Sequence, residues 1–246
     1  MASSTQIPWK RIAAESAAIV GSILLAFSID ALWDNYQDRR EEYEILLGLN
    51  DEFSRHVASI EESLEWVERI SGSIVYLLSQ DVVDVDNLDA VEKIEQAVFQ
   101  SNFSTPPDEL AGGVRDAIFQ SGKLDLIRND ELREALVKWP SSADQLEQQR
   151  IAVTGFVMQT LLPYLSSKGV PLAEMKMPRG HRMTDRRTDA GELGSKYAAL
   201  LADQEYLNLI TVRNWWALGT IADYRSAAER AREIVDVTSR EIQLTE

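Results

Sequence analysis

The most apolar stretch of the chain lies near its start, from Ser16 to Ile29, and continues to Trp33. At about 1.5 Å per helical residue, the run from Ile12 to Trp33 covers about 33 Å, which matches the roughly 30 Å hydrocarbon core of a bilayer. Trp33 and Tyr36 lie at its C-terminal end, where interfacial aromatic residues gather. The pattern predicts an N-terminal tail over 1–11, a transmembrane helix over 12–36 and a helical extramembrane domain over 37–246.

Two other interpretations of this stretch remain open. A cleaved signal peptide has a similar apolar region and basic flank, although residues 27–31 offer no convincing small-residue cleavage site. A buried helix of a soluble protein is the other alternative. If the segment spans a membrane, Lys10 and Arg11 favour an inside N-terminus, and the basic pair at 39–40 partly offsets that bias. We therefore expect a single-pass protein of the bacterial inner membrane, with its large domain in the periplasm.

One side of the predicted span carries small residues at helical spacing, which would let another helix approach closely within lipid. The members of this stripe are Ala14, Ala17, Ala18, Gly21, Ser22, Ala26 and Asp30. Glu15 and Asp30 lie about 60° apart around the helix, because fifteen residues turn through about 100° each. The two carboxylates could line an ion path or clamp a basic partner. Alternatively, both are simply hydrated at headgroup depth.

Apolar residues spaced alternately four and three apart run along two later segments, as in a helical bundle. The first stripe consists of Phe53, Val57, Ile60, Leu64, Val67, Ser71, Ile74 and Leu78. The second consists of Leu207, Ile210, Asn214, Ala217, Ile221, Tyr224, Ala228, Ala231, Val235 and Ile242. The fold class predicted is all-α: the transmembrane helix continues into a long helix, which packs antiparallel to a long C-terminal helix with shorter helices between them.

The shorter helices are expected at about 88–100, 107–121, 129–139 and 141–167, with Pro140 separating the last two. Residues 168–194 are rich in Gly and Pro and predict a long loop. Its basic residues could bind lipid headgroups or an acidic partner, or could belong to an ordinary solvated loop. The patch consists of Lys176, Arg179, Arg182, Arg186 and Arg187.

The composition of the chain excludes several classes of binding and catalytic site. A formal net charge of -15 argues against nucleic-acid binding, and the absence of cysteine excludes disulfides and thiolate catalysis. His56 and His181 are far apart in sequence and are expected at the surface, so we predict no metal, cofactor or catalytic residue. The Trp215-Trp216 pair is interpreted as core or subunit contact.

Several short motifs occur together along the chain: a Glu, a glycine, Ile-Asp and a Trp within Glu15–Trp33, then the charged run Arg39–Glu42 and the stretch from Leu46 to Glu52. In these features the chain resembles a family of uncharacterised bacterial single-span membrane proteins. Further along, Ser121–Leu132 matches a Ser-Gly-Lys-Leu and Asn-x-x-Leu stretch, and Tyr206–Asn208 a Tyr-x-Asn motif. The resemblance implies a membrane-anchored helical protein and no particular activity.

The function expected from these patterns is structural, not enzymatic: a membrane-anchored helical protein that assembles with itself or serves as an accessory subunit of a larger membrane complex. The alternatives are an oligomeric cation channel with Glu15 and Asp30 near its pore, and a membrane-anchored sensor. The expected partners are the lipid bilayer, further copies of the chain and other membrane subunits.

Overall fold

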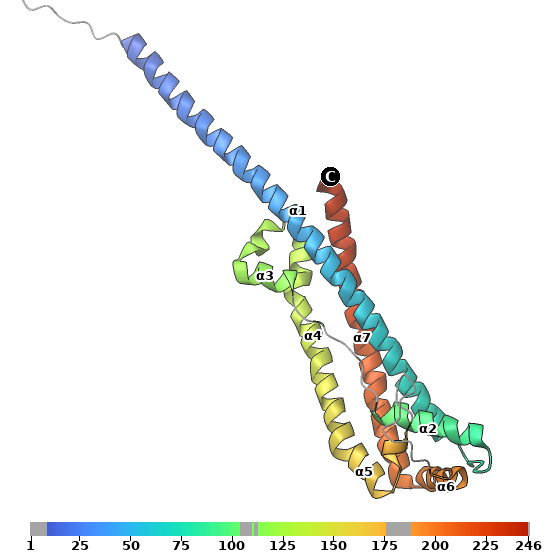
Figure 1. The fold of residues 1–246 in the computed structure, drawn as a ribbon. Coiled ribbons are helices and arrows are strands. Elements are labelled where there is room, and N and C mark those ends of the chain that lie inside the picture. Colours follow the sequence, from blue (N-terminus) through green and yellow to red (C-terminus); the bar gives the residue numbers. More distant parts are fainter. Residues whose placement is uncertain (1–8, 104–109, 111–112, 176–187, 246) are drawn as a thin grey trace, which may run out of the picture.

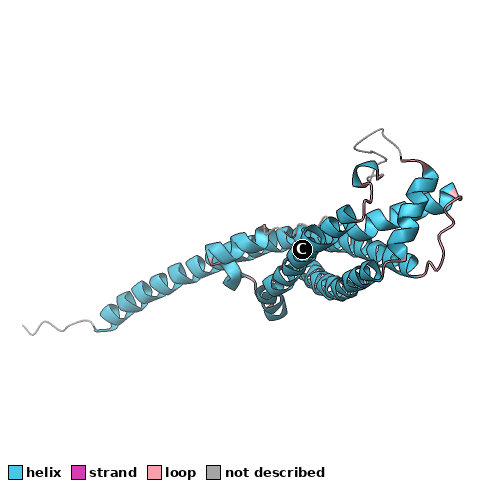
Figure 2. Cartoon of the chain, turned by 90° about the horizontal axis from the view of Figure 1, so that it is seen from below, coloured by secondary structure: helices cyan, strands magenta, loops and turns pink. Residues whose placement is uncertain are grey.

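The computed structural model describes residues 9–103, 110, 113–175 and 188–245, without the side chains of 9–14, 16–18, 190 and 245. This part of the chain is helical and contains no strand (Figure 2), which confirms the all-α class. The α-helices are α1 (Trp9–Leu78), α2 (Leu88–Phe103), α3 (Val114–Ser121), α4 (Asp130–Phe156), α5 (Leu162–Ser167), α6 (Ala190–Leu201) and α7 (Gln204–Thr245). Between them lie short 3₁₀ segments at Lys123–Leu126 and Leu172–Glu174 and a π-helical turn at Val157–Leu161.

Helices α1 and α7 run side by side along most of the molecule (Figure 1) and form its main packing interface. Near the C-terminus, the Asn50 amide donates to the Val235 carbonyl at 3.1 Å and to the Ser239 hydroxyl at 2.8 Å. Near the other end of the pair, the Ser71 hydroxyl donates to Asn214 at 2.8 Å. Early residues of one helix thus meet late residues of the other, as predicted for an antiparallel pair.

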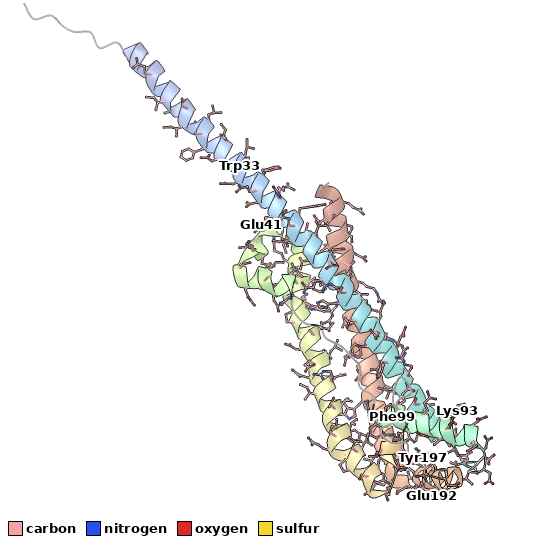
Figure 3. The ribbon with its side chains drawn as sticks, viewed as in Figure 1. Trp33, Glu41, Lys93, Phe99, Glu192 and Tyr197 are labelled. Carbon is pink, nitrogen blue, oxygen red and sulfur yellow. The ribbon has the colours of Figure 1, made fainter. Side chains whose placement is uncertain are left out.

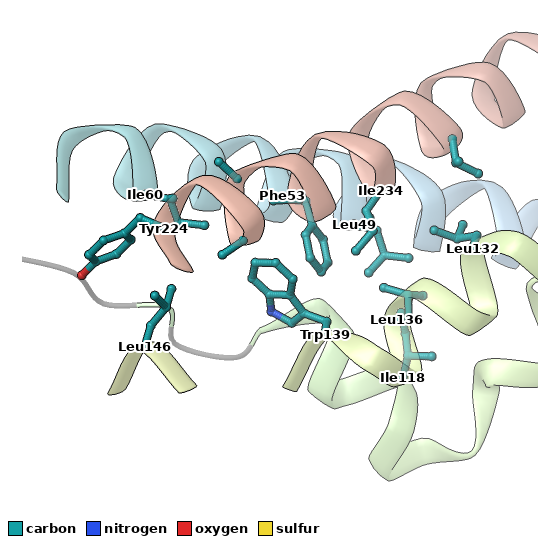
Figure 4. Close-up of a cluster of buried hydrophobic side chains, with 14 of the residues drawn as sticks. Leu49, Phe53, Ile60, Ile118, Leu132, Leu136, Trp139, Leu146, Tyr224 and Ile234 are labelled. Atoms are coloured by element: carbon teal, nitrogen blue, oxygen red, sulfur yellow. The ribbon is translucent and has the colours of Figure 1, made fainter. Parts of the chain in front are cut away.

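Most of the two predicted stripes lies in the core between α1, α4 and α7 (Figure 4), and Ile74 and Ile210 belong to a second buried cluster with α2, α5 and α6. Phe53 is fully buried and meets the Trp139 ring edge to face, with ring centroids 5.0 Å apart. Burying one such side chain contributes roughly 1.5–3 kcal/mol relative to leaving it exposed. The stripe on α1 was wrong at its last position, because Leu77 is buried and Leu78 is 40% exposed.

Helix α4 continues through Pro140, so the predicted break between 139 and 141 was wrong. A proline inside a helix removes the hydrogen bond to the carbonyl four residues earlier, which here is that of Leu136. The Arg115 side chain supplies the missing donor, because its Nε donates to the Leu136 carbonyl at 3.0 Å. Tertiary contact thus compensates for the local helix breaker.

A second proline marks the end of α4. The π-helical turn Val157–Leu161 precedes Pro163, and the backbone N–H of Leu162 donates to the Val157 carbonyl five residues earlier. Such single π-helical turns are a common way for a helix to absorb a local irregularity. The predicted helix over 141–167 is therefore the second half of α4, this turn and α5.

Two other predicted boundaries shift. Helix α3 begins at Val114, later than the predicted 107, and α6 begins at Ala190, inside the predicted loop 168–194. Asp189 explains the second shift, because its carboxylate accepts the backbone N–H of Gly191 at 2.9 Å and caps the helix. The glycines of α6 had indicated a loop, but the cap and the packing of Tyr197 in the core outweigh their low helix propensity.

Candidate membrane-anchoring site

Helix α1 extends beyond the body of the molecule as a single rod (Figure 1). We call its residues 19–40 the shaft. Every residue of the shaft is exposed (Figure 3). Its large apolar side chains are 49–69% exposed and comprise Ile19, Val20, Ile23, Leu24, Leu25, Phe27, Ile29, Leu32, Trp33 and Tyr36.

This exposure is unfavourable in water. Burial of a large aliphatic or aromatic side chain contributes roughly 1.5–3 kcal/mol, and the body of the protein offers the shaft no such burial. Residues 19–29 of the shaft carry no charge, and a helix segment that is apolar on all sides is normally enclosed by a protein core or by lipid. Trp33 and Tyr36 contact each other with ring centroids 6.1 Å apart, at the end of the shaft nearest the body.

Within the described residues, no helix combines the length and the apolar character that crossing a bilayer requires. The predicted transmembrane segment 12–36 begins among residues whose side chains lie outside the described set. Its described part is helical throughout, and α1 passes from it into the body without a break.

The predicted small-residue stripe is only partly visible. The side chains of Ala14, Ala17 and Ala18 lie outside the described residues. The other members, Gly21, Ser22, Ala26 and Asp30, are exposed on the shaft. A methyl group built on Gly21 would meet nothing within 4 Å, so this side of the helix is open to a neighbour.

Glu15 and Asp30 are both exposed on α1, fifteen residues apart.

The root of the shaft is held by the segment between α3 and α4. Buried Glu42 accepts the backbone N–H of Arg128 at 2.8 Å, and the Arg128 guanidinium donates to Asn35 at 2.7 Å. Lys123 forms an ion pair of 2.5 Å with Glu41, which is labelled in Figure 3. These contacts mark where the body begins, and residues 19–34 beyond them are exposed.

A second buried carboxylate holds the start of α3. Glu52 is 3% exposed and accepts the backbone N–H of Arg115 at 3.0 Å. The Gly113 position allows this approach, because a Cβ there would lie 3.2 Å from the Glu52 carboxylate. Helix α3 has no side-chain cap of its own, so α1 supplies the acceptor.

His56 belongs to the same cluster, and the prediction of a surface histidine was wrong. Its ring is 6% exposed, stacks on Trp139 at 5.6 Å and lies 3.5 Å from the Glu52 carboxylate. Burial alone would raise the pKa of Glu52, but hydrogen bonds from His56 and the Arg115 backbone outweigh it and hold that pKa below its ordinary value. The signal in the sequence was the Glu-His spacing of four, which places both side chains on one helix face.

The remaining predicted residues fall in two places. Lys176, Arg179, Arg182, Arg186, Arg187 and His181 all lie outside the described residues. Trp215 and Trp216 lie on α7 and are 68% and 40% exposed, so they are not core residues of the single chain.

A groove of about 480 Å³ lies between α4 and α7, with Trp139 and Ile234 among its lining residues and Arg230 and Glu233 on the α7 side. Such a volume is within the range of small-molecule sites. Across the described chain, no group of three or more His, Cys, Asp or Glu residues is placed to hold a metal ion.

Comparison with known proteins adds no relative. No protein-family model matches the chain, and neither a curated protein nor a solved structure shows significant similarity to it. The resemblance to single-span membrane proteins therefore stays a prediction from the short motifs.

Proposed function

We propose that the chain is a membrane-anchored helical interaction protein, whose shaft lies in a lipid bilayer and whose body presents surfaces to further copies or to other membrane subunits. The observation that carries this proposal is the shaft itself. Ten large apolar side chains are exposed over residues 19–36, on a helix that continues into a well-packed body. Lipid is the surrounding that would remove all of them from water at once.

The direction of the helix supports the same arrangement. Because α1 continues without a break from the shaft into the body, the body would stand away from the bilayer, with α2 and α6 at its far end (Figure 1). With the N-terminus inside, the proposal would have the body in the periplasm of a bacterial cell.

Membrane fractionation tests the anchor. Wild-type chain is expected in the pellet after alkaline carbonate extraction, and its recovery in the supernatant would refute anchoring. Leu24→Arg combined with Phe27→Arg should increase extraction, because each central Arg costs about 2.5–3.5 kcal/mol on insertion. The matched control is Ile151→Arg on α4, since Ile151 is 58% and Leu24 60% exposed, and it should stay in the pellet.

The absence of cysteine makes a topology test simple, because any introduced thiol is unique. Ile23→Cys should resist a membrane-impermeant maleimide in intact cells, whereas Gln148→Cys should be labelled if the body is periplasmic. Labelling of Gln148→Cys only after lysis would place the body on the other side. Equal labelling of both positions in intact cells would contradict a shaft in lipid.

Substitutions of Glu15 and Asp30 distinguish this proposal from the alternative of a cation channel. Glu15→Gln and Asp30→Asn should leave fractionation and particle mass unchanged in an interaction protein. A cation conductance of the reconstituted wild type that either change abolishes would instead support a channel.

A further inference from the structure

Helices α1 and α7 each contain a stretch without exposed charged residues, and the two stretches lie at the same level along the helix pair. Residues 70–78 of α1 carry no charge, and residues 206–222 of α7 carry only Arg213, which is buried. The chain has a net charge of -15 and 26% charged residues, yet here two neighbouring helices both lack exposed charge; further uncharged runs lie at 19–29 and 151–167. It lies in the half of the α1/α7 pair that is farther from the shaft (Figure 1).

The uncharged stretch continues a series of cross-helix ion pairs. Glu61 binds Arg232 at 2.6 Å, and seven residues along each helix Glu68 binds Arg225 at 2.8 Å. A further step of seven residues, from 68 to 75 and from 225 to 218, reaches Val75 and Leu218.

These two positions and the next pair in the same register form an exposed apolar patch. Its members are Val75, Leu78, Trp215 and Leu218, which are 54%, 40%, 68% and 53% exposed. We call these four residues the apolar patch. On α1, Glu61 and Glu68 each come one residue after a core residue, Ile60 or Val67, and so lie about 100° further around the helix. The side of α1 that carries these glutamates and Val75 is therefore turned away from α4.

Two glycines adjoin the patch in the middle of long helices. A Cβ built on Gly72 or on Gly219 would meet nothing within 4 Å, so neither glycine is needed for packing inside the chain. Glycine in a helix interior costs about 1 kcal/mol relative to alanine. Close approach of another helix, which small residues permit, would explain both.

We propose that the apolar patch binds the same patch of a second copy of this chain. This inference rests on the proposed anchoring. Copies that a continuous α1 holds in one bilayer would present the patch at the same distance from the membrane. A dimer with a two-fold axis along the shaft requires that equal distance. Two chains of net charge -15 repel each other, and an uncharged surface is where they can approach at least electrostatic cost. Exposed tryptophan is also the residue type that most often dominates binding at interface centres.

Cysteine cross-linking in native membranes tests the contact, since the chain has no other thiol. Leu218→Cys should give a disulfide-linked dimer on mild oxidation, whereas Ile151→Cys, at a comparably exposed position on α4, should give little. Equal or weaker cross-linking of Leu218→Cys would overturn the proposal. Both variants should match wild type in circular dichroism and in resistance to proteolysis, which would show that the fold is retained.

Particle mass provides a second measurement. Leu218→Glu should lower the mass of the solubilised particle by half relative to wild type, whereas Ile151→Glu should not. A wild-type particle with the mass of one chain, or an unchanged mass for Leu218→Glu, would overturn the proposal.

Fractionation of the same samples keeps the two proposals apart. Chain in the membrane pellet without a Leu218→Cys cross-link would leave anchoring intact and refute pairing. Chain in the supernatant would refute anchoring, and the Leu218→Cys cross-link, compared with its Ile151→Cys control, would still decide pairing.

Discussion

The buried carboxylate of Glu52 offers a sharp test of how α3 is held on α1. In Glu52→Gln the side chain keeps its size and can still accept the Arg115 N–H, but it loses its charge. A hydrogen bond to a charged group contributes about 1.5–3 kcal/mol and a neutral one about 0.5–1.5 kcal/mol. We therefore expect a loss of about 1–2 kcal/mol in the free energy of unfolding. For a chain of this size that corresponds to a fall in Tm of about 2–8 °C.

The pKa of Glu52 also predicts in which direction the stability of the protein changes with pH. Because the folded-state pKa of Glu52 lies below its ordinary value, its stabilising contribution is complete above the unfolded-state pKa, about 4.3. It is lost as the pH falls through the lower folded-state pKa. The stability difference between wild type and Glu52→Gln should thus be largest near neutral pH and shrink below about pH 4.

The assay is urea or thermal unfolding of the solubilised full chain, followed by circular dichroism at several pH values. Glu62→Gln is the matched control, because Glu62 lies on the same helix but is exposed. It should change stability by less than about 0.5 kcal/mol. A Glu52→Gln chain that unfolds like this control, with the wild-type response to acid, would refute the role given to the buried carboxylate.

Two further predictions concern the body. Arg115→Met should destabilise the fold by about 1–3 kcal/mol, because the Leu136 carbonyl loses its donor, and the loss should be smaller in a Pro140→Ala background that restores the helical N–H. Equal losses in both backgrounds would show that Arg115 acts elsewhere. Ile60→Ala, at a fully buried position, should cost about 2–5 kcal/mol in chemical unfolding, and a cost below about 1 kcal/mol would contradict the packing of α4 against α1 and α7.

The long helices could be predicted because their apolar spacing extends over many turns, so that single errors such as the one at Leu78 do not change the pattern. The continuation of α4 through Pro140 could not be predicted, because the donor that replaces the missing backbone N–H belongs to Arg115, which lies on another helix. The burial of His56 was missed for the same kind of reason. The spacing of Glu52 and His56 places both side chains on one face of α1, but it does not indicate that α3 and Trp139 cover that face. The apolar shaft was found from the sequence, whereas the apolar patch needed the register between α1 and α7.

The continuity of α1 also has a mechanical consequence. From Trp33 to Leu78 the helix rises about 68 Å, at about 1.5 Å per residue. Transmembrane helices adopt a range of tilts that depends on bilayer thickness and on their neighbours. With the root of the shaft clamped to the body, a change in tilt of about 10° would carry the far end sideways by about 12 Å, given that rise. If the shaft lies in a bilayer, as proposed above, the helix would act as a lever that converts a small change of tilt there into a large displacement far from it.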